Sequence, residues 1–215
     1  MRQSERDRIH RAALDRLTAS GLVYVCDCSR RSILDAVPVP PGAEPRYPGT
    51  CRGRGLAESA SPMRRIRLEP EAVDFDDLRL GAQRQVPADQ CGDLLARDRD
   101  AQWTYQFAVT VDDLEQGIDL VVRGEDLLAS TGRQVLLARQ LGRDVPPRFL
   151  HHPLVRHPDG AKLSKSNRDT GLADLRAAGW SAGRALGEAA YRAGLLPAPG
   201  ALAAADLAEL FADRG

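Results

Sequence analysis

The chain has 215 residues, of which 43% are hydrophobic and 28% are charged. This composition is that of an ordinary globular protein with enough residues for one domain or two small ones. Its 30 Lys and Arg residues balance its 30 Asp and Glu residues, so net charge neither supports nor excludes a nucleic-acid partner. No apolar run reaches the about 20 residues of a membrane span, and the polar N-terminus is unlike a secretory signal. We expect a cytoplasmic protein with no membrane partner.

The first predicted element is an amphipathic helix near the N-terminus. Ser4, followed three residues later by Asp7, predicts its start as an N-cap pair. Ile9, Ala13 and Leu17 follow at four-residue spacing, which is typical of a helix with one buried face.

Three cysteines follow in a short, Pro-rich stretch and suggest a structural zinc site. Cys26, Cys28 and Cys51 lie within 26 residues of one another, and a protein without a secretory signal is expected to keep its thiols reduced. Zinc takes four ligands, so a fourth group is needed, and Tyr47 and Cys91 are the candidates. The alternative is that the three thiols are buried and unrelated.

Several short strands are predicted between the cysteines and residue 122. The candidates are 63–68, 75–78 and 83–86, and the arginines between 64 and 79 suit either phosphate contacts or a solvated face. Residues 97–102 have the composition of a hairpin tip. Apolar side chains alternate from Tyr105 to Val111, which predicts a further strand, and 118–122 predict another.

The next stretch has the pattern of a parallel sheet with a crossover helix. Ser130 or Thr131 is the predicted cap of a helix that ends near Gly142, and residues 149–155 form the next predicted strand. Strand, strand, helix and strand in this order indicate the second half of a doubly wound α/β sheet. Such sheets bind ligands at the carboxyl ends of their strands, where Arg123 is expected.

A loop at residues 160–168 contains both lysines of the chain, whereas the other 28 basic residues are arginines. Lys162 and Lys165 flank Leu163 and Ser164, and Ser166 completes the sequence KLSKS. Ammonium groups are compact, mobile charges that suit a reacting phosphate. The five residues resemble the KMSKS loop of class I aminoacyl-tRNA synthetases, with Leu in place of Met.

The motifs together, in their order, resemble the glutamyl-Q tRNA(Asp) synthetase branch of the glutamyl-tRNA synthetase-like family. The resemblance implies zinc ligation by Cys26, Cys28, Tyr47 and Cys51. It implies glutamate contacts for Tyr105 and Arg123, with Arg123 facing a substrate carboxylate. Lys162 and Lys165 become the expected catalytic residues, and Lys165 the expected ATP contact.

The family's activity is expected to be ATP-dependent formation of glutamyl-adenylate and transfer of glutamate to queuosine in the anticodon of tRNA(Asp). The implied cofactor is Zn²⁺, ATP is a co-substrate with Mg²⁺, and the partners are tRNA(Asp), glutamate and ATP, with the protein a monomer. The expected fold is α/β: a partial doubly wound, Rossmann-type catalytic domain with a zinc-binding insertion and a C-terminal helical segment. The expected divisions are 1–25, 26–100, 101–168 and 169–215.

The sequence departs from this family at its start. None of the four histidines, at 10, 151, 152 and 157, stands in the HIGH motif that cradles ATP. We therefore expect a truncated, poorly active family member whose half-sheet exposes an apolar edge. Two alternatives remain: a fragment of a glutamyl-tRNA synthetase that charges tRNA(Glu), and a non-catalytic zinc-bearing module that binds tRNA or a protein.

Overall fold

The computed structural model describes residues 2–40, 43–154 and 171–212. The chain divides into two compact units, Met1–His152 and Pro153–Gly215. The predicted Lys162–Ser166 loop lies outside the described residues. Within the described part, no helix is both long and apolar enough to span a membrane.

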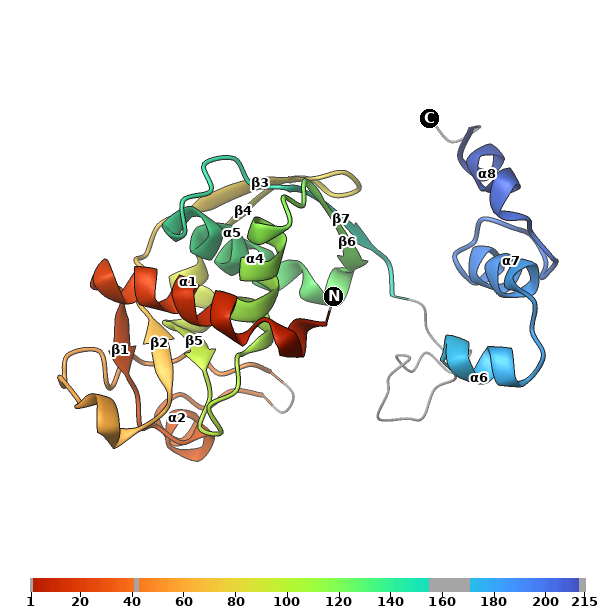
Figure 1. The fold of residues 1–215 in the computed structure, drawn as a ribbon. Coiled ribbons are helices and arrows are strands. Elements are labelled where there is room, and N and C mark those ends of the chain that lie inside the picture. Colours follow the sequence, from red (N-terminus) through yellow and green to blue (C-terminus); the bar gives the residue numbers. More distant parts are fainter. Residues whose placement is uncertain (1, 41–42, 155–170, 213–215) are drawn as a thin grey trace. The chain divides into compact units, whose positions relative to one another are not determined.

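The first unit contains a small antiparallel sheet whose strand order is β1-β2-β5. Its strands are β1 (Val23–Val25), β2 (Arg64–Ile66) and β5 (Leu94–Arg97). Two short helices, α2 (Arg30–Ala36) and α3 (Pro87–Cys91), and the 3₁₀ turn η2 (Glu58–Ala60) belong to the same stretch of chain. We call residues 22–68 and 86–104, which contain the β1-β2-β5 sheet of Figure 1, the cysteine lobe, because the thiols of Cys26, Cys28 and Cys51 cluster there.

The second sheet has the order β4-β3-β7-β6 and is the one that positions Arg123. Its strands are β3 (Val73–Asp77), β4 (Gly81–Gln85), β6 (Leu120–Gly124) and β7 (Arg148–His152). β3 and β4 form an antiparallel hairpin, whereas β7 runs parallel to both β3 and β6. β6 reaches β7 through the 3₁₀ turn η3 (Glu125–Ser130) and helix α5 (Thr131–Gln140), the crossover that parallel neighbours require.

The predicted strands at 63–68, 75–78, 83–86, 118–122 and 149–155 are present with shifted ends, but the strand predicted from Tyr105 is wrong. Residues Tyr105–Glu115 form helix α4. The buried residues include Phe107, Ala108 and Val111, a spacing of one, three and four that belongs to a helix. A short apolar run fits both the strand period of about 2 residues and the helix period of about 3.6 residues. In this chain the packing of residues 105–115 against α5 favours the helix.

Helix α1 (Asp7–Ala19) begins later than predicted. Ser4 lies in a separate 3₁₀ turn, Gln3–Glu5, and its side chain does not cap the helix. The C-terminus follows the prediction: Gly21 adopts a φ of 72°, and the amides of Gly21 and Leu22 donate to the carbonyls of Thr18 and Leu17, as in a Schellman motif. At the start of α5, Ser130 likewise gives no side-chain cap.

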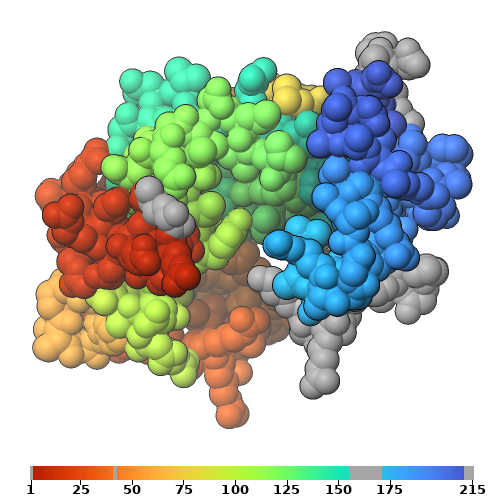
Figure 2. All heavy atoms as spheres, turned by 45° about the vertical axis from the view of Figure 1, so that its right-hand side comes forward, coloured from red at the N-terminus to blue at the C-terminus, as the bar shows by residue number. Residues whose placement is uncertain are grey.

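The main core lies between the second sheet and helices α1, α4 and α5, and it continues into the cysteine lobe. Figure 2 shows the red atoms of α1 beside the green atoms of α4 on the surface of this unit. On the strand β6, which pairs only with β7 among the described residues, Leu120 and Val122 are 37% and 59% exposed. This agrees with the expected apolar edge.

The second unit is helical. It contains α6 (Leu172–Ala177), α7 (Ala182–Arg192), the 3₁₀ turn η5 (Ala204–Ala208) and α8 (Glu209–Ala212). Gly187 packs so closely on the carbonyl of Gly200 that a Cβ there would overlap it. This contact fixes a glycine at that position of α7.

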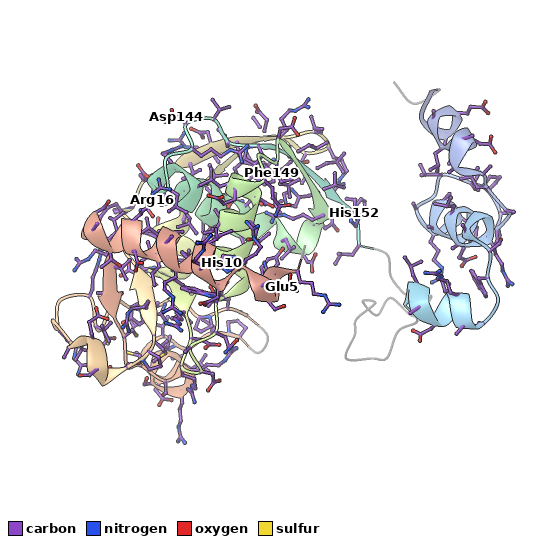
Figure 3. All side chains as sticks on the ribbon, in the orientation of Figure 1. Glu5, His10, Arg16, Asp144, Phe149 and His152 are labelled. Carbon is purple, nitrogen blue, oxygen red and sulfur yellow. The ribbon has the colours of Figure 1, made fainter. Side chains whose placement is uncertain are left out.

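A buried carboxylate joins the N-terminus of α1 to α4. Asp112 accepts hydrogen bonds from Arg6 Nε at 2.6 Å, from His10 Nε2 at 2.9 Å and from Gln3 Nε2 at 2.8 Å. His10, labelled in Figure 3, also packs edge-on against Trp103 and Phe107. Burial opposes ionisation of Asp112, but these hydrogen bonds outweigh it and lower its pKa.

We expect Asp112→Asn to reduce the free energy of unfolding of this unit by about 3 kcal/mol at pH 7, because it removes the buried negative charge that accepts hydrogen bonds from Gln3, Arg6 and His10. A lowered pKa stabilises the fold above the ordinary value of 3.8, and this contribution disappears as the pH falls through the folded-state value. The difference between wild type and variant, measured by urea unfolding, should therefore shrink below pH 4. The exposed pair Asp74–Arg84 supplies the control, because Asp74→Asn should cost under about 1 kcal/mol. Equal losses of unfolding free energy in Asp74→Asn and Asp112→Asn would contradict the stabilising role of the buried Asp112 carboxylate.

Candidate functional site

Arg123 is the centre of the candidate substrate site, and it lies one residue before the end of β6. Its register partner on β7 is His151, so two polar side chains face each other at the carboxyl edge of the parallel strands. Arg123 and His151 are buried, with 9% and 0% of their surfaces exposed. At this edge the buried side chains of β6 and β7 are therefore polar, whereas the main core next to them is apolar.

Three uncharged groups hold the Arg123 guanidinium. Nε donates to His151 Nε2 at 3.0 Å, Nη1 to Gln134 Oε1 at 2.7 Å and Nη2 to Thr131 Oγ1 at 2.8 Å. The guanidinium also lies 5.4 Å from the ring centroid of Phe149, a residue of β7 that is labelled in Figure 3. An arginine has five N–H donors, so these contacts leave donor capacity for a ligand.

His151 can accept from Arg123 because Asp77 fixes its tautomer. Asp77 Oδ2 lies 2.6 Å from His151 Nδ1 and also accepts from the His151 amide at 3.0 Å. Burial opposes ionisation of Asp77, but His151 and the turn amides outweigh it and lower its pKa. The carboxylate is therefore an acceptor, the imidazole proton lies on Nδ1, and the Nε2 lone pair faces Arg123.

The net result is a buried cation without a carboxylate in hydrogen-bond contact among the residues the structure describes. Burial is the main cause that lowers the pKa of Arg123, whereas Tyr105 and the more distant Asp113 and Asp126 raise it. Glu125, two residues further along the chain, pairs with Arg79. A buried charge held only by neutral groups is costly unless an anion joins it, so this geometry favours an anionic ligand.

Tyr105 lies beside this cation as the first residue of α4 and is 51% exposed. Its phenol is near enough to Arg123 to raise the pKa of the guanidinium. The two residues predicted to contact glutamate therefore lie together, although Tyr105 comes from a helix and not from a strand. Sequence reasoning missed Asp77, Thr131, Gln134 and His151. The signal available was the pair of polar residues three apart, Thr131 and Gln134, on the inner face of a buried helix.

The predicted zinc ligands converge in the cysteine lobe. The Sγ atoms of Cys26, Cys28 and Cys51 all lie within 4.8 Å of one another. The Tyr47 hydroxyl is 3.5 Å from Cys26 Sγ and 3.8 Å from Cys28 Sγ. Four ligands on tetrahedral zinc, with Zn–S bonds of about 2.3 Å, lie roughly 3.8 Å apart. The four groups therefore fit a zinc ion.

Cys91, the other candidate for the fourth ligand, lies apart from this group. Its thiol contacts the carbonyls of Pro87 and Gly92, both at 3.3 Å, and burial raises its pKa to about 11. Among the described residues, Cys26, Cys28 and Cys51 form the metal-competent cluster of His, Cys, Asp and Glu side chains. The geometry thus favours Tyr47 over Cys91.

Two arginines supply positive charge around the cysteine cluster. Arg65 Nε lies 3.4 Å from Cys26 Sγ, and its guanidinium lies 3.6 Å from the ring centroid of Tyr47. Arg54 Nη1 binds Asp27 at 2.7 Å and lies 3.5 Å from Cys51 Sγ. Burial opposes ionisation of Cys26, but its hydrogen bonds with Tyr47, the Cys28 backbone and Arg65 lower its pKa. Such outer contacts orient metal ligands and offset their negative charge.

Comparison with known proteins assigns the chain to a family. Residues 1–195 match the family model for class I tRNA synthetases (E and Q), catalytic domain. The chain belongs to this family. The expected class I synthetase fold is thereby confirmed, including its mixed sheets and helices.

Three curated relatives carry the name glutamyl-Q tRNA(Asp) synthetase. The protein from Symbiobacterium thermophilum is 43% identical over 207 residues, which are 92% of this chain and 64% of the relative. The Geobacter sulfurreducens protein is 45% identical and the Burkholderia cenocepacia protein 46%, with 80% and 82% of this chain covered and 55% and 62% of the relatives. The chain thus spans somewhat more than half of their length.

Solved structures give the same fold. A glutamate tRNA ligase from Elizabethkingia meningosepticum, crystallised with its amino acid, superposes with a TM-score of 0.61 at 25% identity. The match covers 78% of this chain and 37% of that one. Glutamate-tRNA synthetase from Elizabethkingia anophelis gives a TM-score of 0.60 at the same identity.

Proposed function

We propose that this chain is the part of an ATP-dependent ligase that binds glutamate and directs it to queuosine in the anticodon of tRNA(Asp). The single observation that carries the proposal is Arg123, a buried cation held by three uncharged acceptors beside Tyr105. Glutamate offers the carboxylate that this cation lacks, and an arginine binds a carboxylate through parallel hydrogen bonds. The named relatives support glutamate and tRNA(Asp) as the substrates.

The chemistry proceeds in two transfers. A glutamate carboxylate oxygen attacks the α-phosphate of ATP, an O–P bond forms, and the bond to pyrophosphate breaks. A nucleophilic group of queuosine then attacks the activated carbonyl, and AMP leaves. We propose that Lys162 and Lys165 stabilise the α-phosphate in the first transfer, with Mg²⁺ on ATP, since preorganised positive charge is the largest catalytic term in such reactions.

The function is tested by transfer of labelled glutamate, with the chain alone and with a chimera. In the chimera, residues 1–195 replace the matching stretch of the Symbiobacterium thermophilum relative. Label is expected on tRNA(Asp) that contains queuosine and absent from tRNA(Asp) that lacks it. Label on tRNA(Glu) would instead assign the glutamyl-tRNA synthetase activity, and a folded chimera that labels neither tRNA would contradict the proposal.

Arg123→Lys is expected to weaken glutamate binding at least about 10-fold, a loss of about 1.4 kcal/mol, because ammonium cannot reproduce the guanidinium geometry. His151→Gln should produce a smaller loss, since it removes the acceptor that orients Arg123 Nε. Isothermal titration with glutamate checks both, and Arg84→Lys on the exposed face of the same sheet is the matched control. Unchanged affinity in Arg123→Lys would place the glutamate site elsewhere.

We further propose that Cys26, Cys28, Tyr47 and Cys51 bind one structural Zn²⁺. Thiols must lose their protons to bind the metal, and burial raises the pKa of Cys28 to about 11, so the ion itself has to drive this ionisation. We also propose, as expected from the sequence, that the chain divides after residues 25, 100 and 168.

Metal analysis of protein purified without chelator should give about one zinc per chain. Cys51→Ser is expected to lose most of the metal and to loosen the cysteine lobe, because structural zinc contributes directly to folding. Cys91→Ser should retain it and serves as the thiol control. A zinc content far below one per chain in the wild type would refute the site, and loss in Cys91→Ser would refute the ligand set.

A further inference from the structure

The described part of the chain contains a cavity of about 440 Å³ that borders the zinc site through Cys28 and Tyr47 but is not lined by Tyr105 or Arg123. It lies between the cysteine lobe and the N-terminal ends of α4 and α5. Its apolar lining includes Ile33 and Leu95, and its polar lining includes Gln106 and Arg133. Pockets of roughly 300–1,000 Å³ that are mostly apolar with a few polar groups are typical of ligand sites.

Arg133 gives this cavity a buried donor. The residue is only 4% exposed. Its Nη1 binds the carboxylate of Glu44 at 2.8 and 2.9 Å, but its Nε is buried without a hydrogen-bond partner in the described structure. A buried donor of this kind normally has an acceptor, and a ligand in the cavity would supply one.

The rim of the cavity carries unpaired positive charge. Arg30, at the start of α2, and Arg99, in the turn after β5, both line the cavity and are exposed. Neither guanidinium has a hydrogen bond or an ion pair with any described residue. Most of the acidic side chains that line the cavity already have partners. Glu44 forms an ion pair with Arg133, and Asp93 accepts hydrogen bonds from the Tyr24 hydroxyl and the Leu68 amide. Asp98 accepts from the amides of its own turn.

A short hydrogen-bond path leads from the cavity to Arg123. Gln106 lines the cavity, and its Oε1 accepts from Gln134 Nε2 at 2.6 Å. Gln134 Oε1 in turn accepts from Arg123 Nη1 at 2.7 Å. Gln106 therefore uses its oxygen inside the protein, and its NH₂ group remains as a donor toward a ligand.

We propose that this cavity receives one nucleoside of an RNA strand, with its base against the apolar wall and its flanking phosphates on Arg30 and Arg99. The inference rests on the proposed function, because it places the acceptor nucleoside next to the glutamate held by Arg123. Arg133 Nε and the Gln106 amide donate to the base or sugar. Two exposed guanidinium groups on separate elements suit two successive phosphates of a strand, and RNA is read through single-stranded, unstacked bases of this kind.

The test is binding of an RNA hairpin with the tRNA(Asp) anticodon loop, carrying queuosine at its modified position, as a function of salt. Arg30→Ala/Arg99→Ala should weaken binding about 10-fold and reduce the slope of log affinity against log salt by about 1.4, since each lost phosphate contact on a single strand removes about 0.7. Arg31→Ala is the matched control, because Arg31 neighbours Arg30 on α2, is 92% exposed and does not line the cavity. Wild-type affinity in the double variant, or an equal loss in Arg31→Ala, would overturn the proposal.

A second variant separates the base from the phosphates. Gln106→Ala should keep the salt slope but lose the preference for the queuosine hairpin over one with guanosine at that position. Circular dichroism and zinc content verify that each variant is folded. If Gln106→Ala still prefers the queuosine hairpin, Gln106 does not contact the base and the proposal that the base enters this cavity is wrong.

Glutamate titration separates failure of this inference from failure of the proposed function. If the chain binds glutamate through Arg123 but its RNA affinity is independent of Arg30 and Arg99, the cavity assignment is wrong and the function stands. If RNA binding depends on the two arginines while glutamate does not bind, the cavity is an RNA site and the proposed function fails.

Discussion

The structure depends most on one buried network at the carboxyl edge of a parallel sheet: Asp77, His151 and Arg123. Each member determines the state of the next. The Asp77 carboxylate places the imidazole proton on Nδ1 of His151, and the free Nε2 accepts from Arg123. In a low-dielectric interior such a chain of hydrogen bonds is strong when complete and costly when any partner is removed. It holds a guanidinium rigidly while leaving it without a neutralising carboxylate.

The surrounding elements bring this network together from distant parts of the chain. Asp77 comes from the end of β3, His151 from β7, and Thr131 and Gln134 from the first turns of α5. The crossover through α5 is a consequence of parallel strands, and it places polar side chains of a helix over the ends of two strands. The second link, Gln134 to Gln106, joins the same arginine to α4 and to the cavity beside the cysteine lobe.

Motif residues were predictable from the sequence, whereas their supporting residues were not. The spacing of Cys26, Cys28 and Cys51 indicated a cluster but left Tyr47 and Cys91 open as the fourth ligand. The family resemblance implied Tyr47, and the fold places Tyr47 beside the cluster and Cys91 apart from it. Arg123 followed from its place after a strand. The helix at Tyr105 was mispredicted because its apolar residues fit both periods over seven positions, and packing against α5 decided between them. His151 gave no sequence signal, since its role requires Asp77, 74 residues earlier.

The most direct measurement is nuclear magnetic resonance of the Arg123 side chain, with ¹⁵N label, during titration with glutamate and with glutamine. We predict that the Arg123 Nε and Nη signals shift on addition of glutamate and scarcely move with glutamine at the same concentration, because both ligands have an α-carboxylate and only glutamate has the side-chain carboxylate that would pair with the guanidinium. Equal shifts with both ligands, or no shift with glutamate in folded, zinc-containing protein, would contradict the claim that Arg123 binds the side-chain carboxylate of glutamate.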